Sequence, residues 1–506
     1  MAVTIRVVTH NIFESPDNGI VIPVQQNFSY TTGLVSQAVA YVPHLQELAQ
    51  QRDFTGKQGT MLTVTASIGG ILRTLILVGV GVRVDKPLAI ESWRRLVGSV
   101  VRLSEQARLG SLAIALPDPA LYGVTQEYLA QQTTIIMHVA AYRFDQFITE
   151  PERQLCKVKQ VSMVVESHDK QATEHGVTSG TIVGDAMNHT REWVNMPANK
   201  MTPIDLAGHA LAIAQEYGLG CTIFDENKVK EMGMGGLAAV SSGSHVECRF
   251  VVLEYQCADK NAPTLCFVGK GITFDSGGLS IKPAAGMEAM KDDMSGAAAV
   301  IATMRALAQL KPNVNVVGIA PMSENLPSGF PTKPGDIVTF YNGKTAEIKN
   351  TDAEGRLILA DALAYAVKHY TVDAIIDVAT LTGACAYALG PFFTGMISEH
   401  DELVARIQES SARSGDAVWR LPITDDYKPV VKSVVADLCN IGKEAYRAGA
   451  ITAACFLQAF VGDRPWVHLD IAGTAFNVPD ISYYRPESAT GVGVRLLIDL
   501  AVHWRQ

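Results

Sequence analysis

Residues 264–278 read TLCFVGKGITFDSGG, and this stretch indicates the fold of the chain most clearly. Its first part, Thr264 to Val268, is short and apolar, which is typical of a strand buried on both faces of a sheet. Lys270 and Asp275 follow this strand closely. In open α/β sheets, ligands bind beyond the carboxyl ends of the strands. The stretch therefore predicts a buried strand that places a cation and a carboxylate at a ligand site.

The C-terminal part of the chain contains several segments of the same kind. Near-continuous apolar strands are predicted at 250–253, 264–268, 314–319, 374–378 and 466–471, and helices at 296–310, 356–368 and 448–460. Strands that alternate with helices are typical of a parallel sheet. We therefore predict an α/β domain over residues 196–506, with a mostly parallel sheet covered by helices on both faces.

The N-terminal part of the chain also alternates between strands and helices. Short β-branched segments predict strands at 3–8, 20–24, 61–66, 75–82, 112–116 and 161–165, and helices are predicted at 93–109 and 128–144. This pattern indicates a separate α/β domain over residues 1–170. A polar, helix-compatible segment at 171–195 is predicted to connect the two domains. A chain of 506 residues is long enough for both.

Composition excludes several classes of partner. The net charge of −9 argues against a nucleic-acid partner, because such partners require a basic face. No apolar run approaches the roughly 20 residues of a membrane helix, and the N-terminus lacks a signal-peptide pattern. The eight cysteines show no CxxC spacing, which is typical of reduced thiols in a chain of this size. We therefore expect a cytoplasmic protein that does not enter a membrane.

Three acidic turns indicate a metal site. They lie within residues 270–278, 287–296 and 350–357. Carboxylates gathered at low dielectric repel one another unless a cation compensates them, and four carboxylates would neutralise two divalent ions. Oxygen ligands suit hard or borderline ions, and paired ions catalyse hydrolysis. The alternative is that these acids cap helices or lie in surface turns. No HExxH zinc motif or GxSxG nucleophile motif occurs.

These residues carry a family resemblance. VGKGITFDSGG (268–278), MKDDMSGAA (290–298) and NTDAEGRL (350–357) resemble the signatures of the cytosolic leucyl aminopeptidase family, whose members are dinuclear metallo-exopeptidases. The resemblance covers about residues 180 to 500, whereas residues 1 to about 170 show little of it. It implies an enzyme that removes the first residue from peptides with a free N-terminus, and a homo-oligomer, specifically a hexamer.

The resemblance also implies a set of metal ligands and two divalent ions in each subunit. The ions would be Zn²⁺ or Mn²⁺, with Co²⁺ also accommodated. In this pattern two of the ligands, Asp275 and Glu354, bridge the ions and a hydroxide ion lies between them. The residues implied as ligands are Lys270, Asp275, Asp293, Asp352 and Glu354.

Two further residues have implied catalytic roles. The ammonium group of Lys282 would stabilise negative charge on the substrate carbonyl oxygen. Arg356, at the start of a predicted helix, would hold a bicarbonate ion that accepts a proton from water. The alternatives are a surface lysine at 282 and a salt bridge from Arg356 to a ligand carboxylate. Lys291 and Asp292 are expected to face solvent.

For substrate binding, the resemblance implies that Met290, Ala472 and Ala475 line the first side-chain pocket, while Thr380 and Leu381 position the substrate backbone. Small residues and an adaptable thioether would admit leucine and methionine. His468, which alternates with apolar residues, is predicted to be a hydrogen-bonded core histidine. Two other functions stay open at this point: a two-metal phosphoesterase, and a regulatory scaffold that retains the site.

Overall fold

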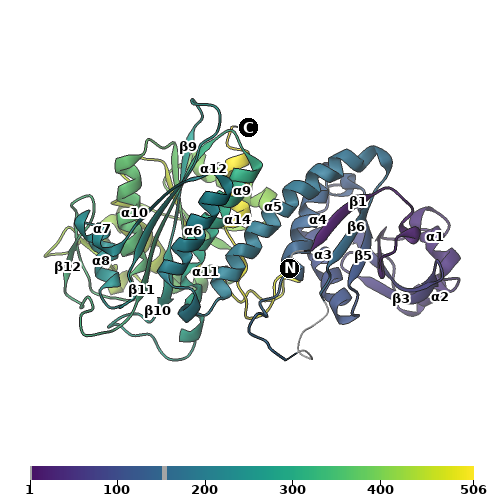
Figure 1. The fold of residues 1–506 in the computed structure, drawn as a ribbon, viewed down its shortest axis with the longest axis horizontal. Coiled ribbons are helices and arrows are strands. Elements are labelled where there is room, and N and C mark those ends of the chain that lie inside the picture. The colour runs from purple at the N-terminus through teal and green to yellow at the C-terminus, as the bar shows by residue number, and fades with distance from the viewer. Residues whose placement is uncertain (1–2, 151–156, 506) are drawn as a thin grey trace. The chain divides into compact units, whose positions relative to one another are not determined.

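The computed structural model describes residues 3–150 and 157–505, and the chain divides into two compact units (Figure 1). The first unit comprises Met1–Asn188 and Asp480–Arg485, and the second comprises His189–Pro479 and Pro486–Gln506. Each unit contains its own sheet and helices, so the prediction of two α/β domains is confirmed. The domain limits 1–170, 171–195 and 196–506 stay predictions.

The first unit is built on a six-stranded sheet with the order β1-β6-β5-β2-β4-β3. All neighbouring strands are parallel except β3 and β4. The strands are β1 (Thr4–Val8), β2 (Gly19–Gln25), β3 (Met61–Ile68), β4 (Ile71–Gly81), β5 (Ser111–Ala115) and β6 (Gln160–Val164). The helices are α1 (Gly33–Tyr41), α2 (Leu45–Gln51), α3 (Ile90–Gln106) and α4 (Gln126–Ala141). The six predicted strands and two predicted helices are present; α1 and α2 were not predicted.

Helix α5 (Lys170–Asn195) occupies the segment that the sequence predicts as a connector. Its residues up to Asn188 belong to the first unit, and those from His189 belong to the second. Among the helices of residues 3–150 and 157–505, none has both the length and the apolar character needed to cross a membrane.

The second unit contains a nine-stranded sheet with the order β16-β15-β18-β14-β9-β11-β8-β7, and β10 pairs with β11. Five of its strand pairs are parallel and three are antiparallel, so the prediction of a mostly parallel sheet is confirmed. The strands are β7 (Gly220–Phe224), β8 (Arg249–Tyr255), β9 (Thr264–Gly269), β10 (Gly271–Asp275), β11 (Asn315–Asn325), β14 (Ala374–Ala379), β15 (Thr394–Ile397), β16 (Val418–Leu421) and β18 (Trp466–Asp470).

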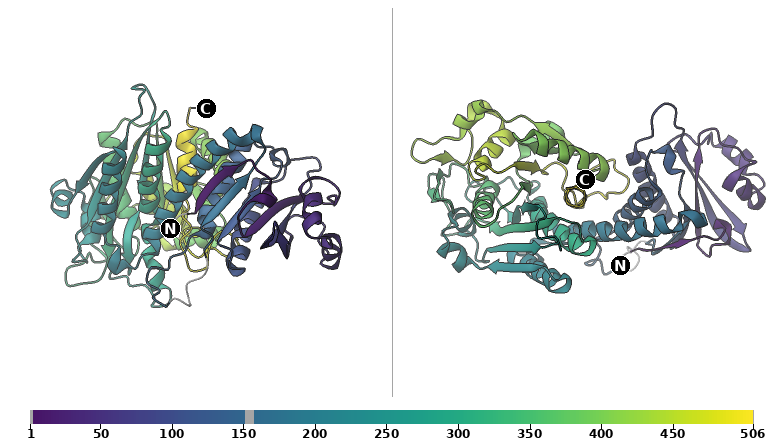
Figure 2. Two further views of the ribbon diagram at one scale, coloured as in Figure 1. Left: turned by 45° about the vertical axis from the view of Figure 1, so that its right-hand side comes forward. Right: turned by 90° about the horizontal axis from the view of Figure 1, so that it is seen from above.

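Helices cover both faces of this sheet (Figure 2), and α9 and α10 both pack on β9 and β11. The helices are α6 (Pro203–Tyr217), α7 (Glu226–Glu231), α8 (Gly235–Ser241), α9 (Ser295–Leu310), α10 (Gly355–His369), α11 (Gly383–Leu389), α12 (Asp401–Ser414), α13 (Gly449–Gln458) and α14 (Val494–Val502). A small sheet adds β12 (Ile337–Thr339), β13 (Thr345–Glu347) and β17 (Leu438–Cys439).

Five parallel strands end at one edge of the large sheet. In the register of the sheet, Asp275 at the end of β10 pairs with Asn325 at the end of β11. Asp470 at the end of β18 pairs with Ala379, the last residue of β14. Lys270 directly follows β9, and Thr380 directly follows β14. The carboxyl ends of β9, β10, β11, β14 and β18 therefore bring polar side chains to one place, where ligands of such sheets bind.

Candidate metal centre

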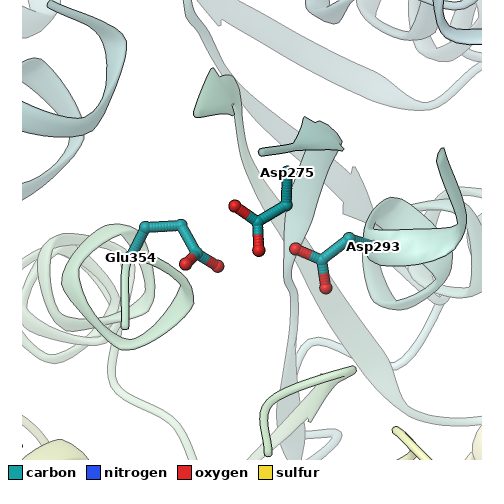
Figure 3. A group of neighbouring side chains, drawn as sticks. All are labelled: Asp275, Asp293 and Glu354. Atoms are coloured by element: carbon teal, nitrogen blue, oxygen red, sulfur yellow. The ribbon is translucent and has the colours of Figure 1, made fainter. Parts of the chain in front are cut away.

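Three buried carboxylates meet at this edge. Asp275, Asp293 and Glu354 each offer an oxygen, and these oxygens all lie within 4.8 Å of one another. Figure 3 shows the three carboxylates pointing toward a common centre. All three residues are at most 5% exposed. Like charges at this separation and burial require a compensating cation.

Three different elements position these carboxylates. Asp275 ends strand β10, and Asp293 lies in the 3-10 helix η6 (Met287–Met294) just before α9. Glu354 is the N-cap residue of α10, but its side chain makes no capping hydrogen bond. Its carboxylate is directed to the cluster instead (Figure 3). The alternative that Glu354 serves as a helix cap is therefore not supported by the geometry.

Lys270 lies between two of the carboxylates. Its Nζ is 2.7 Å from Asp293 Oδ1 and 2.9 Å from Glu354 Oε1, and it donates a hydrogen bond of 2.8 Å to Thr380 O. Burial alone would lower the pKa of Lys270, but attraction by Asp293 and Glu354 outweighs it and the pKa is raised. Lys270 is an ammonium group in this arrangement. It can become a neutral ligand only if other cations replace it beside the carboxylates.

Lys282 and Asp352 form the accessible end of the cluster. Lys282 Nζ is 2.8 Å from Asp275 Oδ2 and 2.5 Å from Asp352 Oδ1. The side chains of Lys282 and Asp352 are 20% and 30% exposed, compared with 3% for Asp275 and Glu354. Lys282 is therefore not an isolated surface lysine, and solvent reaches the cluster from the side of Asp352.

The cluster has more negative than positive charge. Among the described residues, the ammonium groups of Lys270 and Lys282 are the only cationic groups within salt-bridge distance of these four carboxylates. Burial raises the pKa of Asp275 to about 6, with repulsion by Glu354 adding to the effect, and burial also raises the pKa of Asp293. Asp293 Oδ2 and Glu354 Oε2 are buried without a hydrogen-bond partner among the described residues. These free oxygens and the excess negative charge fit divalent cations.

Arg356 lies in the first turn of α10, beside the cluster, and is 7% exposed. It donates from Nη1 to Asn440 O at 2.8 Å, and its Nε has no hydrogen-bond partner within the described part of the chain. No carboxylate of residues 3–150 or 157–505 lies within salt-bridge distance of it, which argues against the alternative of a salt bridge to a ligand. Burial lowers the pKa of Arg356 to about 10. A buried guanidinium with a free N–H group fits a small anion.

The residues predicted to bind substrate lie around the same edge. Thr380 donates from Oγ1 to Asp293 Oδ1 at 2.7 Å, so it directly adjoins the cluster. The backbone N–H groups of Leu381 and Ala472 both donate to Asp470 Oδ1, at 3.1 and 3.2 Å. Ala475 is 1% exposed, whereas Met290, Leu381 and Ala472 are half-buried.

Two residues that sequence reasoning missed organise this region. Asp470, fully buried, accepts from Leu381 N, Ala472 N and Thr382 Oγ1, and so holds the turns after β14 and β18 together. Asn325 donates to Asp275 Oδ1 at 2.8 Å. In the sequence, Asp470 and Asn325 are marked as candidate site residues only by being polar residues at the end of an apolar strand.

The structure decides two smaller predictions. His468 is fully buried and its Nδ1 lies 2.6 Å from Asp377 Oδ1, so the prediction of a hydrogen-bonded core histidine is confirmed. The expectation that Lys291 and Asp292 face solvent is wrong. Lys291 Nζ donates to Asn195 O at 3.0 Å, and burial raises the pKa of the half-buried Asp292 to about 7.

Comparison with known proteins connects this geometry to a family. Residues 188–498 match the catalytic domain of the cytosol aminopeptidase family, and residues 21–151 match the N-terminal domain of that family. The chain is 41% identical over 467 residues to a probable cytosol aminopeptidase of Desulforapulum autotrophicum, which covers 90% of this chain and 89% of the relative.

Solved structures are similar over almost the whole chain. A mutant of tomato leucine aminopeptidase superposes with a TM-score of 0.87 at 31% identity, covering 99% of this chain and 96% of the tomato chain. The bottromycin maturation enzyme BotP in complex with Mn gives a TM-score of 0.84 at 31% identity, covering 97% of this chain and 100% of that chain.

Proposed function

The chain belongs to the cytosol aminopeptidase family and is a metal-dependent leucyl-type aminopeptidase that acts on peptides, and we propose that five of its side chains hold two divalent ions. The observation that carries this proposal is the buried cluster of carboxylates, whose negative charge exceeds the positive charge of the neighbouring ammonium groups. Asp293 and Glu354 each have one oxygen without a hydrogen-bond partner among the described residues. The residues that would hold the ions are Lys270, Asp275, Asp293, Asp352 and Glu354, and Asp275 and Glu354 would serve both ions.

We propose Zn²⁺ or Mn²⁺ as the ions, with Co²⁺ as an effective substitute, because oxygen-rich ligand sets accept all three. When bound, such a pair supplies a hydroxide nucleophile near neutral pH and polarises the scissile carbonyl group. The protein's own contribution is to hold the carboxylates in fixed positions and to exclude most of the water from the inner end of the cluster.

Two cationic side chains complete the proposed chemistry. The ammonium group of Lys282, at the accessible end, can turn toward the carbonyl oxygen as negative charge develops there, which is worth about 3–4 kcal/mol in comparable sites. Arg356, with its free Nε, holds a bicarbonate ion in our proposal. That ion would supply the general base that the cluster lacks.

The substrate enters from the side of Asp352 and Lys282 in this proposal, since these are the more exposed members of the cluster. Thr380 and Leu381 then position the peptide backbone, and the side chain of the first residue contacts Met290, Ala472 and Ala475. We also propose that the protein is cytoplasmic, as the names of its relatives suggest, and that it assembles as a homohexamer.

Removal of metal tests this function. Chelator-treated protein is expected to lose hydrolysis of leucine amide, and added Mn²⁺, Zn²⁺ or Co²⁺ should restore it to different extents. The ion nearer Asp352 should exchange faster, because the side chain of Asp352 is 30% exposed whereas the side chain of Asp293 is 7% exposed. The measurement is the rate of leucine release alongside the metal content of the same sample. Full activity in protein verified as metal-free would overturn the proposal.

Gly355 offers a second test, because it leaves space for Lys270. A Cβ atom at Gly355 would lie 2.7 Å from Lys270 Nζ and 2.8 Å from its Cδ. Gly355→Ala is therefore expected to displace the lysine from between Asp293 and Glu354 and to reduce kcat/KM by about 100-fold, the typical cost of misplacing a catalytic group by about 1 Å.

The matched control is Gly208→Ala, in helix α6, where an added Cβ meets no atom within 4 Å. This change should leave activity intact and stabilise the helix by up to about 1 kcal/mol. Wild-type kcat/KM in the Gly355→Ala variant would show that the position of Lys270 is not required for catalysis.

A further inference from the structure

Asn325 connects two of the acidic turns of the metal centre. It is the last residue of β11 and is 5% exposed. Its Nδ2 group donates to Asp275 Oδ1 at 2.8 Å and to Thr351 O at 3.0 Å. The backbone carbonyl oxygen of Asn325 accepts from Ser276 N at 3.0 Å and from Ser276 Oγ at 2.7 Å. One side chain therefore contacts both the carboxylate of Asp275 and the backbone of the residue that precedes Asp352.

Hydrogen bonds from Thr351 reinforce this connection. Thr351 Oγ1 donates to Gly277 O at 2.7 Å and accepts from Ser280 N at 2.8 Å. In return, Ser280 Oγ accepts from Thr351 N at 3.1 Å. We call Asn325, Thr351 and Ser280 the inter-turn clamp. It joins the turn that follows Asp275 to the turn that contains Asp352 through hydrogen bonds to the backbone and the side chain of Thr351.

The clamp also helps to hold the carboxylate of Asp275 in one orientation. Asp275 Oδ1 accepts from Gly277 N at 2.9 Å as well as from Asn325. Asp275 Oδ2 instead lies 2.8 Å from the Lys282 ammonium group. Neutral N–H donors therefore occupy Oδ1, and Oδ2 is directed at a cationic group.

The packing around the clamp leaves little freedom. Gly278 has a φ of +63°, and a Cβ atom there would lie 2.9 Å from Asn325 Oδ1 and 3.1 Å from Thr351 Oγ1. A residue other than glycine would thus both strain the backbone and push the clamp apart.

We propose that Asn325 is a positioning residue of the metal centre: its amide orients Asp275 and sets the spacing between Asp275 and Asp352. This inference rests on the proposed function, because it assumes that divalent ions bind to these carboxylates. Hydrogen bonds that orient metal ligands typically contribute 10- to 100-fold to metal affinity. Asn325 touches neither the ions nor the substrate in this proposal, and it acts through Asp275.

The test compares Mn²⁺ affinity, by calorimetric titration of metal-free protein, between the wild type, Asn325→Ala and a matched control. The control is Asn315→Ala, at the opposite end of the same strand. Asn315 accepts from Cys257 N at 3.0 Å and donates to Ala262 O at 3.4 Å. We expect Asn325→Ala to weaken Mn²⁺ binding by about 10- to 100-fold and Asn315→Ala to leave it unchanged.

A second pair of variants separates positioning from general destabilisation. Thr351→Val removes the hydroxyl group at nearly constant volume, whereas Thr351→Ser keeps it. Thr351→Val should weaken Mn²⁺ binding and change the visible absorption spectrum of Co²⁺-loaded protein. Thr351→Ser should keep the wild-type affinity and the wild-type spectrum. Melting temperatures of the metal-free variants report on any loss of folding.

The outcomes distinguish this inference from the proposed function. If the wild type binds no Mn²⁺, the metal centre itself is refuted. If the wild type binds Mn²⁺ but folded Asn325→Ala binds it equally well, the positioning role of Asn325 is overturned. Equal weakening in Asn315→Ala would likewise overturn it, since the effect would then reflect the strand as a whole.

Discussion

Replacement of Asp275 or Glu354 by alanine is expected to abolish peptide hydrolysis, with a larger loss than Arg356→Ala causes. The two carboxylates lie within 4.8 Å of each other and of Asp293, and in our proposal each contacts both ions. Loss of either one should therefore remove the ion pair. In our proposal Arg356→Ala removes only the group that would hold the base, so the expected loss is at least about 100-fold and can be partly offset by bicarbonate in the buffer.

The measurement is kcat for leucine amide at saturating Mn²⁺, with the number of bound ions determined for each variant. Asp401→Ala is a suitable control, because the Asp401 side chain is 83% exposed and lies in α12. It should keep full activity. Losses of equal size in all three site variants would show that Arg356 has a structural role through its hydrogen bond to Asn440 O.

Several elements around the site could be predicted because their signals are local, although β10, which ends at Asp275, and η6, which contains Asp293, were predicted only as turns. Strands β9, β14 and β18 are short apolar runs, and the residues that follow them had to lie at the carboxyl edge of a parallel sheet. Lys270 and Asp275 are within six residues of the end of β9, so their approximate position followed from the strand alone. Helices α9 and α10 were predictable from their apolar composition and length.

The parts that could not be predicted depend on contacts between distant residues. Asn325 and Asp275 are 50 residues apart, and Lys291 reaches the carbonyl group of Asn195 across 96 residues. No pattern in the sequence says which polar groups will meet once the turns are folded. The short helices α1 and α2 were missed for a related reason, since helices of nine and seven residues depend on tertiary packing rather than on their own propensity.

A second large loss of activity is expected when the amino group of the substrate is blocked. A carboxylate-rich centre with an accessible end at Asp352 is suited to a free α-amine, which the ions and nearby acids recognise together. Acetylation delocalises the lone pair of this amine into the amide group and adds bulk beside Asp352. Correct positioning contributes several kcal/mol in such reactions, and about 4 kcal/mol corresponds to roughly 1,000-fold in rate. We therefore expect a free amine to be essential.

Leucine amide and N-acetyl-leucine amide, compared as substrates of the same metal-loaded protein, show whether the enzyme recognises a free N-terminus. We expect kcat/KM to fall by at least about 1,000-fold on acetylation, with kcat affected as well as KM. A phosphomonoester measured in parallel should be a poor substrate. Comparable cleavage of the acetylated compound, or faster cleavage of the phosphomonoester, would contradict an aminopeptidase that recognises the free N-terminus at this centre.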